Sequence, residues 1–307
     1  MNTRRHFLAQ SLAAAPLLAG IQPSRAGTPA AATSPAAASP LCFFTKHLQG
    51  LSLEQIAEVA AEMGLNGVES PIRPKGHIEP ERVPDELPRF VEALKRHGLE
   101  LTIMTSGINE VSAEQHSESV LRTAAKLGVK RFRMHYFKYD LSKPIWPQLQ
   151  EIRPKLRDLV ALCDELGILP MVQNHSGRDY VGAPIWDMYS LMQEYQPTQL
   201  AFCYDILHAT VEGGLQWPLS AALTSTHRGA VYFKDFQWQG RKSETCPLGE
   251  GQVDPAFAKQ LVAQGYRGPI SLHVEYLKGD ARRPEVLAEF KKAHVRDLAK
   301  LKSWLAA

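Results

Sequence analysis

The sequence has few cysteines. Its 307 residues include four, namely Cys42, Cys163, Cys203 and Cys246. No two of them have the C-x-x-C spacing of zinc or redox motifs, and three lie in apolar runs, where a cysteine is more often a buried thiol than a ligand. An oxidising compartment would permit a disulfide, but the spacing predicts no pairing.

Long hydrophobic runs are absent as well. The apolar stretch Leu8–Leu18 near the N-terminus is continued only by Ile21 and is broken by Gly20 and Pro23. A membrane-spanning helix needs about 20 mostly apolar residues in a row. We therefore expect no stable membrane insertion.

The same N-terminal stretch has the features of an export signal. Thr3–Leu8 reads T-R-R-H-F-L, a twin-arginine pattern, and Ser24-Arg25-Ala26 offers small residues for a cleavage site. We predict that residues 1–26 are a twin-arginine signal peptide, with an amphipathic helix as the alternative, and that the protein is periplasmic or exported by this route. Residues 27–40 contain only Gly, Thr, Pro, Ala and Ser, so we expect a disordered linker there.

Neither sign of charge is in excess. The chain has 35 Lys and Arg against 32 Asp and Glu, and removal of residues 1–26 takes away Arg4, Arg5 and Arg25 but no acids. The formal charge of the remainder is therefore 0. With no basic stripe to follow a phosphate backbone, we expect no nucleic-acid partner.

From residue 41 onwards, short apolar runs alternate with amphipathic ones. The short runs predict strands at 41–45, 67–69, 99–105, 129–136, 168–175, 200–205, 230–235 and 269–276. Apolar residues at helical spacing predict helices at 52–63, 81–96, 112–127, 147–166, 184–195, 218–227, 255–264 and 284–305. Many of these helices stop at a glycine, as left-handed C-caps require.

Eight βα units fit either a closed barrel or an open doubly wound sheet. The first strand lacks a following G-x-G-x-x-G, and polar residues recur at the ends of at least six strands rather than at one switch point. We therefore predict an α/β fold: a single (β/α)8 TIM barrel over residues 41–307, preceded by the signal peptide and the linker.

Charged residues mark the carboxyl ends of several predicted strands, which form the active face of such barrels. Side chains alternate along a strand, and we expect the small or polar set of each to face the interior. This set comprises Gln173, His175, Asp205, Lys234, His273 and Glu275, with His208 just beyond a strand. The opposite set should pack under the helices: Val172, Phe202, Tyr204, Val231, Phe233, Leu272 and Val274.

These interior residues suit metal-assisted proton transfer. Carboxylates, an amide oxygen and imidazoles are ligands for a divalent ion of borderline hardness, so we predict a Mn, Zn, Co or Mg site. The predicted ligands are Gln173, Asp205, Glu275 and His273. The predicted catalytic residues are Glu275, Lys234, His208, His175 and Glu69, with Lys234 holding an oxyanion and a Glu or His carrying the proton.

Each of these residues has a structural alternative. A lone Asp at a strand end often caps a helix or brackets a loop. Lys234 and Asp235 could form an ion pair at the barrel rim, and His273 could be a core histidine. The convergence of four adjacent strands favours a site over these separate roles.

Several short motifs, in their order and spacing, resemble the sugar phosphate isomerase/epimerase family, the xylose-isomerase-like TIM barrel group. They span roughly residues 41–300 and comprise G-L-N-G-V-E at 64–69, Q-N-H-S-G at 173–177, D-x-x-H-A at 205–209, F-K-D at 233–235, P-L-G-E-G at 247–251 and G-Y-x-G-P-I-S at 265–271.

The resemblance implies a divalent metal held by Glu, Asp, His and Glu from the fifth to eighth strands. Asp205 matches the family Asp and Glu275 the last Glu, while His208 matches the substrate-contacting His of D-x-x-H. Gln173 stands where the family often has Glu, and Tyr232 where it often has His. The site would then lack one anionic and one imidazole ligand, unless His175 or His273 supplies a replacement.

We therefore expect an exported carbohydrate-active enzyme that enolises a keto-sugar or keto-glycoside with a divalent metal, as an isomerase, an epimerase or a lyase. Its partner would be a small carbohydrate substrate, and a homo-oligomer is left open. The alternative is a metal-free sugar-binding barrel without catalysis. An enzyme like endonuclease IV would need a larger His-rich cluster and a basic face, which this sequence lacks.

Overall fold

A computed structural model describes residues 39–306 of the chain. The predicted signal peptide at 1–26 and the linker up to residue 38 lie outside the described residues, so those boundaries stay predictions. In the part that is described, no helix combines the length and the hydropathy that crossing a membrane requires.

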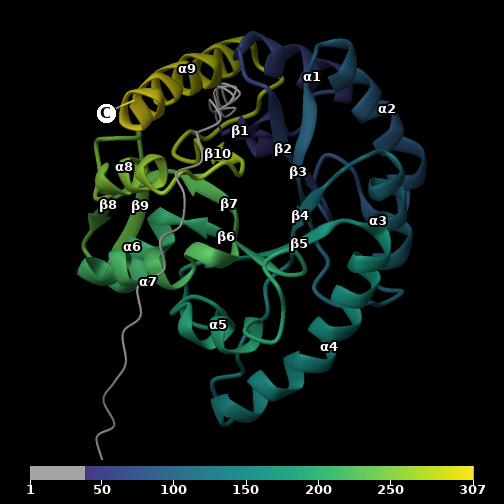
Figure 1. Cartoon of the computed structure of the whole chain (residues 1–307). Helices are drawn as coiled ribbons and strands as arrows, with labels where there is room; N and C mark the ends of the chain where they lie inside the picture. The colour runs from purple at the N-terminus through teal and green to yellow at the C-terminus, as the bar shows by residue number, and fades with distance from the viewer. Residues whose placement is uncertain (1–38, 307) are drawn as a thin grey trace, which may run out of the picture. The chain divides into compact units, whose positions relative to one another are not determined.

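Eight parallel strands close into a barrel, as the sequence predicts (Figure 1). The order around the barrel is β1-β10-β7-β6-β5-β4-β3-β2. The barrel strands are β1 (Leu41–Phe44), β2 (Gly67–Ile72), β3 (Glu100–Ser106), β4 (Arg131–Arg133), β5 (Leu169–Gln173), β6 (Ala201–Asp205), β7 (Arg228–Phe233) and β10 (Ile270–Leu272). The pairing of β1 with β10 closes the ring, with Leu41 opposite Ile270.

Helices lie around the outside of the barrel (Figure 1). They are α1 (Leu53–Glu62), α2 (Val83–Arg96), α3 (Ser117–Lys126), α4 (Ile145–Leu166), α5 (Trp186–Met192), α6 (Ile206–Gly213), α7 (Trp217–Leu223), α8 (Ala256–Ala263) and α9 (Pro284–Ala306). Ser52 caps α1 in a reciprocal capping box with Gln55, as its sequence position predicts. Gly167 ends α4 with φ +64°, the left-handed conformation that favours glycine.

Strand alternation divides the core into two layers. The apolar side chains inside the barrel form a small cluster: Cys42, Ile103, Met171, Ala201, Cys203, Ala230 and Tyr232. The opposite set on the same strands packs outward against the helices in the larger cluster, which includes all seven residues predicted to lie there: Val172, Phe202, Tyr204, Val231, Phe233, Leu272 and Val274. The four cysteines are free thiols, and Cys42, Cys163 and Cys203 are buried, as expected.

Several predicted boundaries are wrong. The second strand does not end at Glu69, because β2 continues in register with β3 as far as Ile72. The helix expected from Ser112 begins at Ser117, since His116 has φ +51° and interrupts the helical path. Gly229, the glycine that we expected to stop the helix predicted at 218–227, does not cap a helix; it lies inside β7, where an added Cβ would meet Met171 Sδ and Ala201 Cβ at 2.8 Å.

Two elements after the strand ends were not predicted. Helix α6 follows β6 directly, and a hairpin of β8 (Asp235–Gln239) and β9 (Lys242–Cys246) follows β7. The strands of the barrel are also shorter than the apolar runs that predicted them. His175, Lys234, His273 and Glu275 therefore stand just beyond β5, β7 and β10 rather than in them.

Candidate active site

A buried ammonium group lies between two carboxylates at the carboxyl ends of β6, β7 and β10. Lys234 Nζ is 3.1 Å from Asp205 Oδ2 and 3.1 Å from Glu275 Oε2. The side chains of Lys234 and Asp205 are 4% and 0% exposed, whereas that of Glu275 is 19% exposed. The convergence of Asp205, Lys234 and Glu275 at one rim agrees with the sequence expectation.

Backbone contacts hold Asp205 in place. It is the last residue of β6 and the N-cap of α6, where its Oδ1 accepts from the His208 backbone N–H at 3.2 Å. The Asn174 side chain donates to the Asp205 carbonyl at 3.0 Å and accepts from the Asp205 N–H at 2.8 Å. The position of Asp205 is therefore fixed both by the backbone of α6 and by the side chain of Asn174, directly after β5.

Gln173, at the end of β5, connects Asp205 to the next strand. Its Nε2 donates to Asp205 Oδ2 at 2.7 Å. Its Oε1 accepts from the Tyr136 hydroxyl at 2.8 Å and also from Arg133 Nη1. These donors fix the orientation of the amide, with its nitrogen toward the carboxylate and its oxygen toward the guanidinium.

Arg133 and Tyr136 were not predicted as site residues. Arg133 is the last residue of β4, is 4% exposed and donates to the Tyr136 hydroxyl at 2.6 Å. A signal was present in the sequence, because Arg131 and Arg133 alternate with Phe132 and Met134, which places an arginine on the interior face. Arg133 brings a second buried cation to the site.

Opposite charges set the ionisation of the central residues. Burial alone would raise the pKa of Glu275, but the charges of Lys234, His273 and Lys46 outweigh it and hold that pKa well below its usual range. Burial would likewise lower the pKa of Lys234, yet the charges of Asp205 and Glu275 raise it above its ordinary value. Lys234 and Glu275 are therefore both charged at neutral pH.

A small cavity opens beside these residues. Its volume is about 170 Å³, and its lining residues are Phe44, Lys46, Arg73, Arg133, Tyr136, Gln173, His175, Lys234, His273 and Glu275. A second cavity of about 370 Å³ shares Lys46 and Arg73 with the first and adds Lys75 and His135. The first cavity alone is smaller than a typical ligand site, which measures roughly 300–1,000 Å³, but together with the second cavity the space lies within that range.

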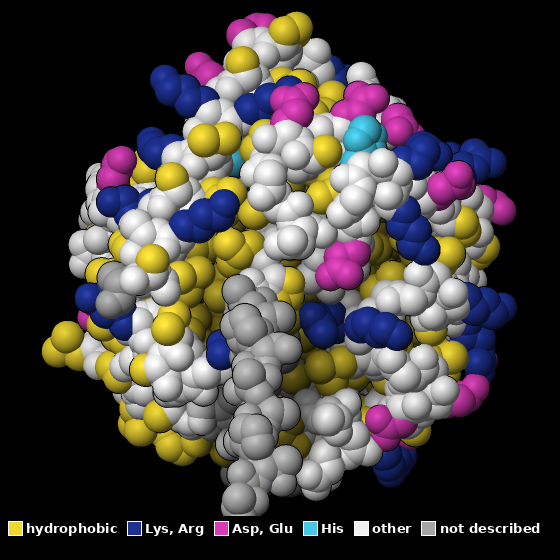
Figure 2. Space-filling model, turned by 45° about the horizontal axis from the view of Figure 1, so that its top comes forward, with side chains coloured by type: hydrophobic (Ala, Val, Ile, Leu, Met, Phe, Trp, Pro, Cys, Tyr) yellow, Lys and Arg dark blue, Asp and Glu magenta, His cyan; other side chains and the backbone are white. Residues whose placement is uncertain are grey.

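The charges around the cavity are mostly positive. Lys46, Arg73, Arg133 and Lys234 line it, against the single lining carboxylate of Glu275. In the view of Figure 2, Lys and Arg side chains are interspersed with Asp and Glu rather than gathered in one continuous area. The lining of the cavity therefore carries more cations than carboxylates.

The two predicted catalytic histidines lie side by side but differ in access. The rings of His175 and His208 are 3.9 Å apart between centroids. His175 lines the cavity, and burial together with the charge of Lys234 lowers its pKa to about 4. His208 is 6% exposed and bonds to the Ser176 hydroxyl at 2.7 Å; burial and the charge of Lys234 lower its pKa well below the usual value. Both imidazoles are neutral at neutral pH.

Glu69 and His273 form a separate buried pair next to the site. His273 Nε2 is 2.9 Å from Glu69 Oε2, and the Thr105 hydroxyl donates to Glu69 Oε1 at 2.6 Å. Burial would raise the pKa of Glu69, but the charge of His273 and these hydrogen bonds lower it to about 2. The structure therefore brings Gln173, Asp205, Lys234 and Glu275 together and leaves Glu69 bonded to His273.

The predicted metal ligands do not present a ligand set in this arrangement. Gln173 turns its amide nitrogen toward Asp205, Glu275 meets Asp205 only through Lys234, and His273 is engaged by Glu69. Burial raises the pKa of Tyr232 well above its usual value, so it stays a neutral phenol, which is a poor ligand. As they stand, these residues do not fit a divalent ion.

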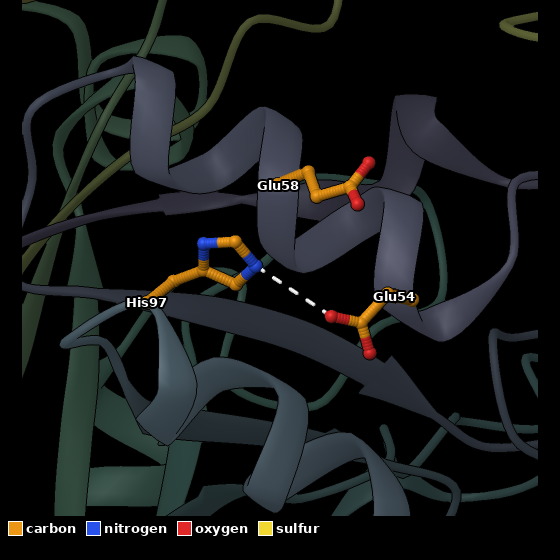
Figure 3. A group of neighbouring side chains, drawn as sticks. All are labelled: Glu54, Glu58 and His97. Carbon is orange, nitrogen blue, oxygen red and sulfur yellow. Dashed lines mark ion pairs between the residues drawn. The ribbon is translucent and has the colours of Figure 1, made fainter.

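Elsewhere among residues 39–306, one group of carboxylates and imidazole could hold a metal ion: Glu54, Glu58 and His97 (Figure 3). It lies on the outside of the barrel between α1 and the end of α2. His97 Nε2 is 3.6 Å from Glu54 Oε1, and Arg96 also pairs with Glu54. This group is exposed and already includes an ion pair, so we give it no role in the site.

Comparisons with known proteins agree with this architecture. Residues 57–297 match the family model described as "Xylose isomerase-like TIM barrel". A comparison with curated protein sequences finds no match.

Three solved structures illustrate the fold. A D-psicose 3-epimerase from Clostridium cellulolyticum has a TM-score of 0.66 and 11% identity, over 87% of this chain and 99% of that one. A 3-keto-D-glucoside 4-epimerase from Escherichia coli has a TM-score of 0.62 and 16% identity, over 86% and 99%. A probable 3-DHS dehydratase from Bacillus anthracis has a TM-score of 0.65 and 16% identity, over 86% and 98%. At these identities the likeness shows the fold alone.

Proposed function

The chain belongs to the xylose isomerase-like TIM barrel family, and from this premise we propose that it is a carbohydrate enzyme that enolises a keto-sugar or keto-glycoside. The observation that carries the proposal is the buried Lys234 ammonium between Asp205 and Glu275, beside a cavity at the active face of the barrel. A site that only binds neutral sugar has no need for a buried cation between two carboxylates.

Enolisation needs a base for the proton on the carbon next to the ketone and a cation for the oxygen. In the proposed step, the Glu275 carboxylate takes that proton, the electron pair of the C–H bond forms the C=C bond, and the carbonyl π pair moves to oxygen. Lys234 and Arg133 are the cations that can stabilise the resulting oxyanion. His175, a neutral imidazole in the same cavity, is a second group able to hold a proton.

The fate of the enolate decides the reaction class. Return of the proton to the neighbouring carbon gives an isomer, return to the other face of the same carbon gives an epimer, and loss of a substituent beside the enolate gives elimination. The solved structures with this fold include epimerases and a dehydratase, and all of these reactions can share an enolate. We propose the shared step and leave its outcome to the substrate.

We also propose that the mature protein acts on extracytoplasmic sugars or glycosides rather than on sugar phosphates or nucleic acid. The support is the twin-arginine pattern at Arg4 and Arg5 and the zero formal charge of the chain after residue 26. A small carbohydrate is then the expected partner.

Deuterium exchange followed by NMR tests the enolisation without knowledge of the product. We expect the wild type to exchange the proton next to the ketone in at least one of a panel of keto-sugars and 3-keto-glycosides. Glu275→Gln should slow this exchange by about 10²–10⁴-fold, because the base is lost while the shape is kept. Glu285→Gln, which changes an exposed carboxylate paired with Arg283, is the matched control and should leave exchange unchanged.

Two outcomes would count against the proposal. Equal exchange by wild type and Glu275→Gln would remove Glu275 from the mechanism. Absence of exchange by the wild type across the panel, with sugar binding retained, would favour a sugar-binding barrel without catalysis.

A further inference from the structure

We propose that the Lys234 ammonium takes the position that the family resemblance assigns to a divalent cation, so that this barrel works without a metal ion. The part of the proposal that concerns turnover rests on the enolising function proposed above. The part that concerns metal binding does not.

The Lys234 ammonium occupies the space between the two carboxylates. The two carboxylates matched to the family's metal ligands are Asp205 and Glu275, and both point an oxygen at Lys234 Nζ, at 3.1 Å each. A divalent ion shared by these carboxylates would have to lie between them. That space holds the end of a side chain from β7, the strand between β6 and β10 in the barrel.

The two remaining ligand positions of the family pattern, Gln173 and Tyr232, also differ from it in chemistry. Gln173 has an amide in place of a carboxylate, and its oxygen already accepts from both Arg133 and Tyr136. Tyr232 has a neutral phenol in place of an imidazole. At these two positions a metal would therefore find neither the third anionic ligand nor the imidazole of the family pattern.

Cations of the protein already balance the charge of the two carboxylates. Lys234, Lys46 and Arg133 contribute three positive charges around the two carboxylates. Buried charges are stable only when they are paired, and the carboxylates are already paired here. A divalent ion added to this arrangement would be repelled by Lys234 at close range.

An ammonium in this position can perform the electrostatic part of the metal's task. It offers a fixed positive charge, and the N–H that Asp205 and Glu275 do not engage can donate to an oxyanion. The ammonium is also attached to the barrel rim by the chain itself. Chelators cannot remove it. The expected enzyme is therefore indifferent to EDTA, in contrast to one that depends on a bound ion.

Metal content tests the proposal on the wild type. We expect the purified protein, analysed by inductively coupled plasma mass spectrometry, to hold well below one equivalent of Mn, Zn, Co or Mg together. EDTA should leave its melting temperature unchanged, because a ligand that is not bound cannot contribute to stability. One equivalent of metal, lost on chelation together with thermal stability, would overturn the proposal.

Substitution of the two lysines that contact Glu275 gives a matched comparison. Lys234→Ala should leave Asp205 and Glu275 without their shared cation and strengthen Mn²⁺ binding by about 100-fold over the wild type in calorimetric titration. Lys46→Ala removes a cation that pairs with Glu275 alone, and its Mn²⁺ affinity should stay within a few-fold of the wild type. Equal Mn²⁺ affinity in the wild type, Lys46→Ala and Lys234→Ala would contradict the proposal.

A rebuilt site gives a second test, which does not depend on the stability of one variant. Lys234→Ala combined with Gln173→Glu and Tyr232→His restores the family's ligand types and should bind Mn²⁺ more tightly than Lys234→Ala alone. Circular dichroism establishes that each variant is folded. Because these readouts measure metal, a wild type that contains no metal and shows no exchange on any substrate would reject the enolising function while leaving this inference in place.

Discussion

The buried ionised side chains of this barrel are each held by a partner. Lys234, Asp205, Glu69 and Arg133 are all less than 5% exposed, and each lies within hydrogen-bond reach of an oppositely charged or polar group. Removal of one partner from such a pair commonly costs about 3–5 kcal/mol, because the other charge stays buried. The site therefore depends on its own electrostatics for stability as well as for chemistry.

Histidine 77 should make stability depend on pH. Its Nε2 is 3.0 Å from both the hydroxyl and the carbonyl of Thr45, which ties the chain after β2 to the chain after β1. Burial lowers the pKa of His77 to about 4; the charge of Arg73 adds to this effect, and the bond to the Thr45 carbonyl opposes it. In the unfolded chain the pKa of histidine is about 6.5.

Between pH 6.5 and 4 the unfolded chain therefore binds the proton that folded His77 does not. The contribution of neutral His77 to the free energy of unfolding is fully present above pH 6.5. It falls by at most about 1.4 kcal/mol per pH unit as the pH drops toward 4. Urea unfolding at pH 7, 6 and 5 should show a shallower loss for His77→Gln than for the wild type. Parallel curves for the two proteins would contradict the assignment.

Part of the site could be predicted from residues alone. A charged residue after an apolar run indicates a strand end, which located Asp205, Lys234 and Glu275. Arg133 was missed because β4 is only three residues long and Arg131 in the same strand is also basic. Which carboxylate pairs with which cation could not be predicted, since it depends on distances across the barrel that no local pattern records.

Among the connecting elements, the hairpin β8–β9 and the loop after it are organised by one carboxylate. Asp235 accepts backbone N–H bonds from Phe236 at 2.8 Å, Gly249 at 2.9 Å, Gly251 at 3.1 Å and Val253 at 2.9 Å. The alternative of an ion pair between Asp235 and Lys234 is therefore wrong. Lys234 pairs with Asp205 and Glu275, whereas Asp235 accepts backbone N–H bonds from this loop.

Asp235→Ala should leave four buried or half-buried N–H groups without an acceptor. Bonds to a charged group contribute roughly 1.5–3 kcal/mol each, so we expect a loss of at least about 3 kcal/mol in the free energy of unfolding. Hydrogen exchange followed by mass spectrometry should show faster exchange in residues 247–253. Asp254→Ala is the control, because the Asp254 side chain accepts a single backbone N–H bond, from Ala256, in an exposed position. An equal effect of both changes would argue against the role of Asp235 in holding this loop.

The helices and strands were predicted correctly where a local sequence pattern specifies them. They were predicted wrongly where their length or existence depends on pairing with another segment of the chain. The cap at Ser52 and the glycine after α4 are local signals, and both occur as predicted. The length of β2 depends on pairing with β3, and the hairpin on pairing of β8 with β9. These are contacts between segments that the sequence of one segment does not specify.

For the whole chain, we expect export to depend on the N-terminal arginines. Arg4→Lys combined with Arg5→Lys should retain the protein in the cytoplasm with its N-terminus uncleaved, because the twin-arginine pattern is then lost. Cell fractionation and N-terminal mass analysis measure both effects. Normal periplasmic accumulation of the double variant would show that a different signal directs export.

The closing pair of the barrel has a consequence for synthesis. Strand β1 pairs on one side with β2 and on the other with β10, which is the last of the barrel strands that the ribosome makes. Contacts between segments so distant in the chain form slowly. One side of β1 therefore stays unpaired until β10 has been synthesised, and the ring can close only after that point.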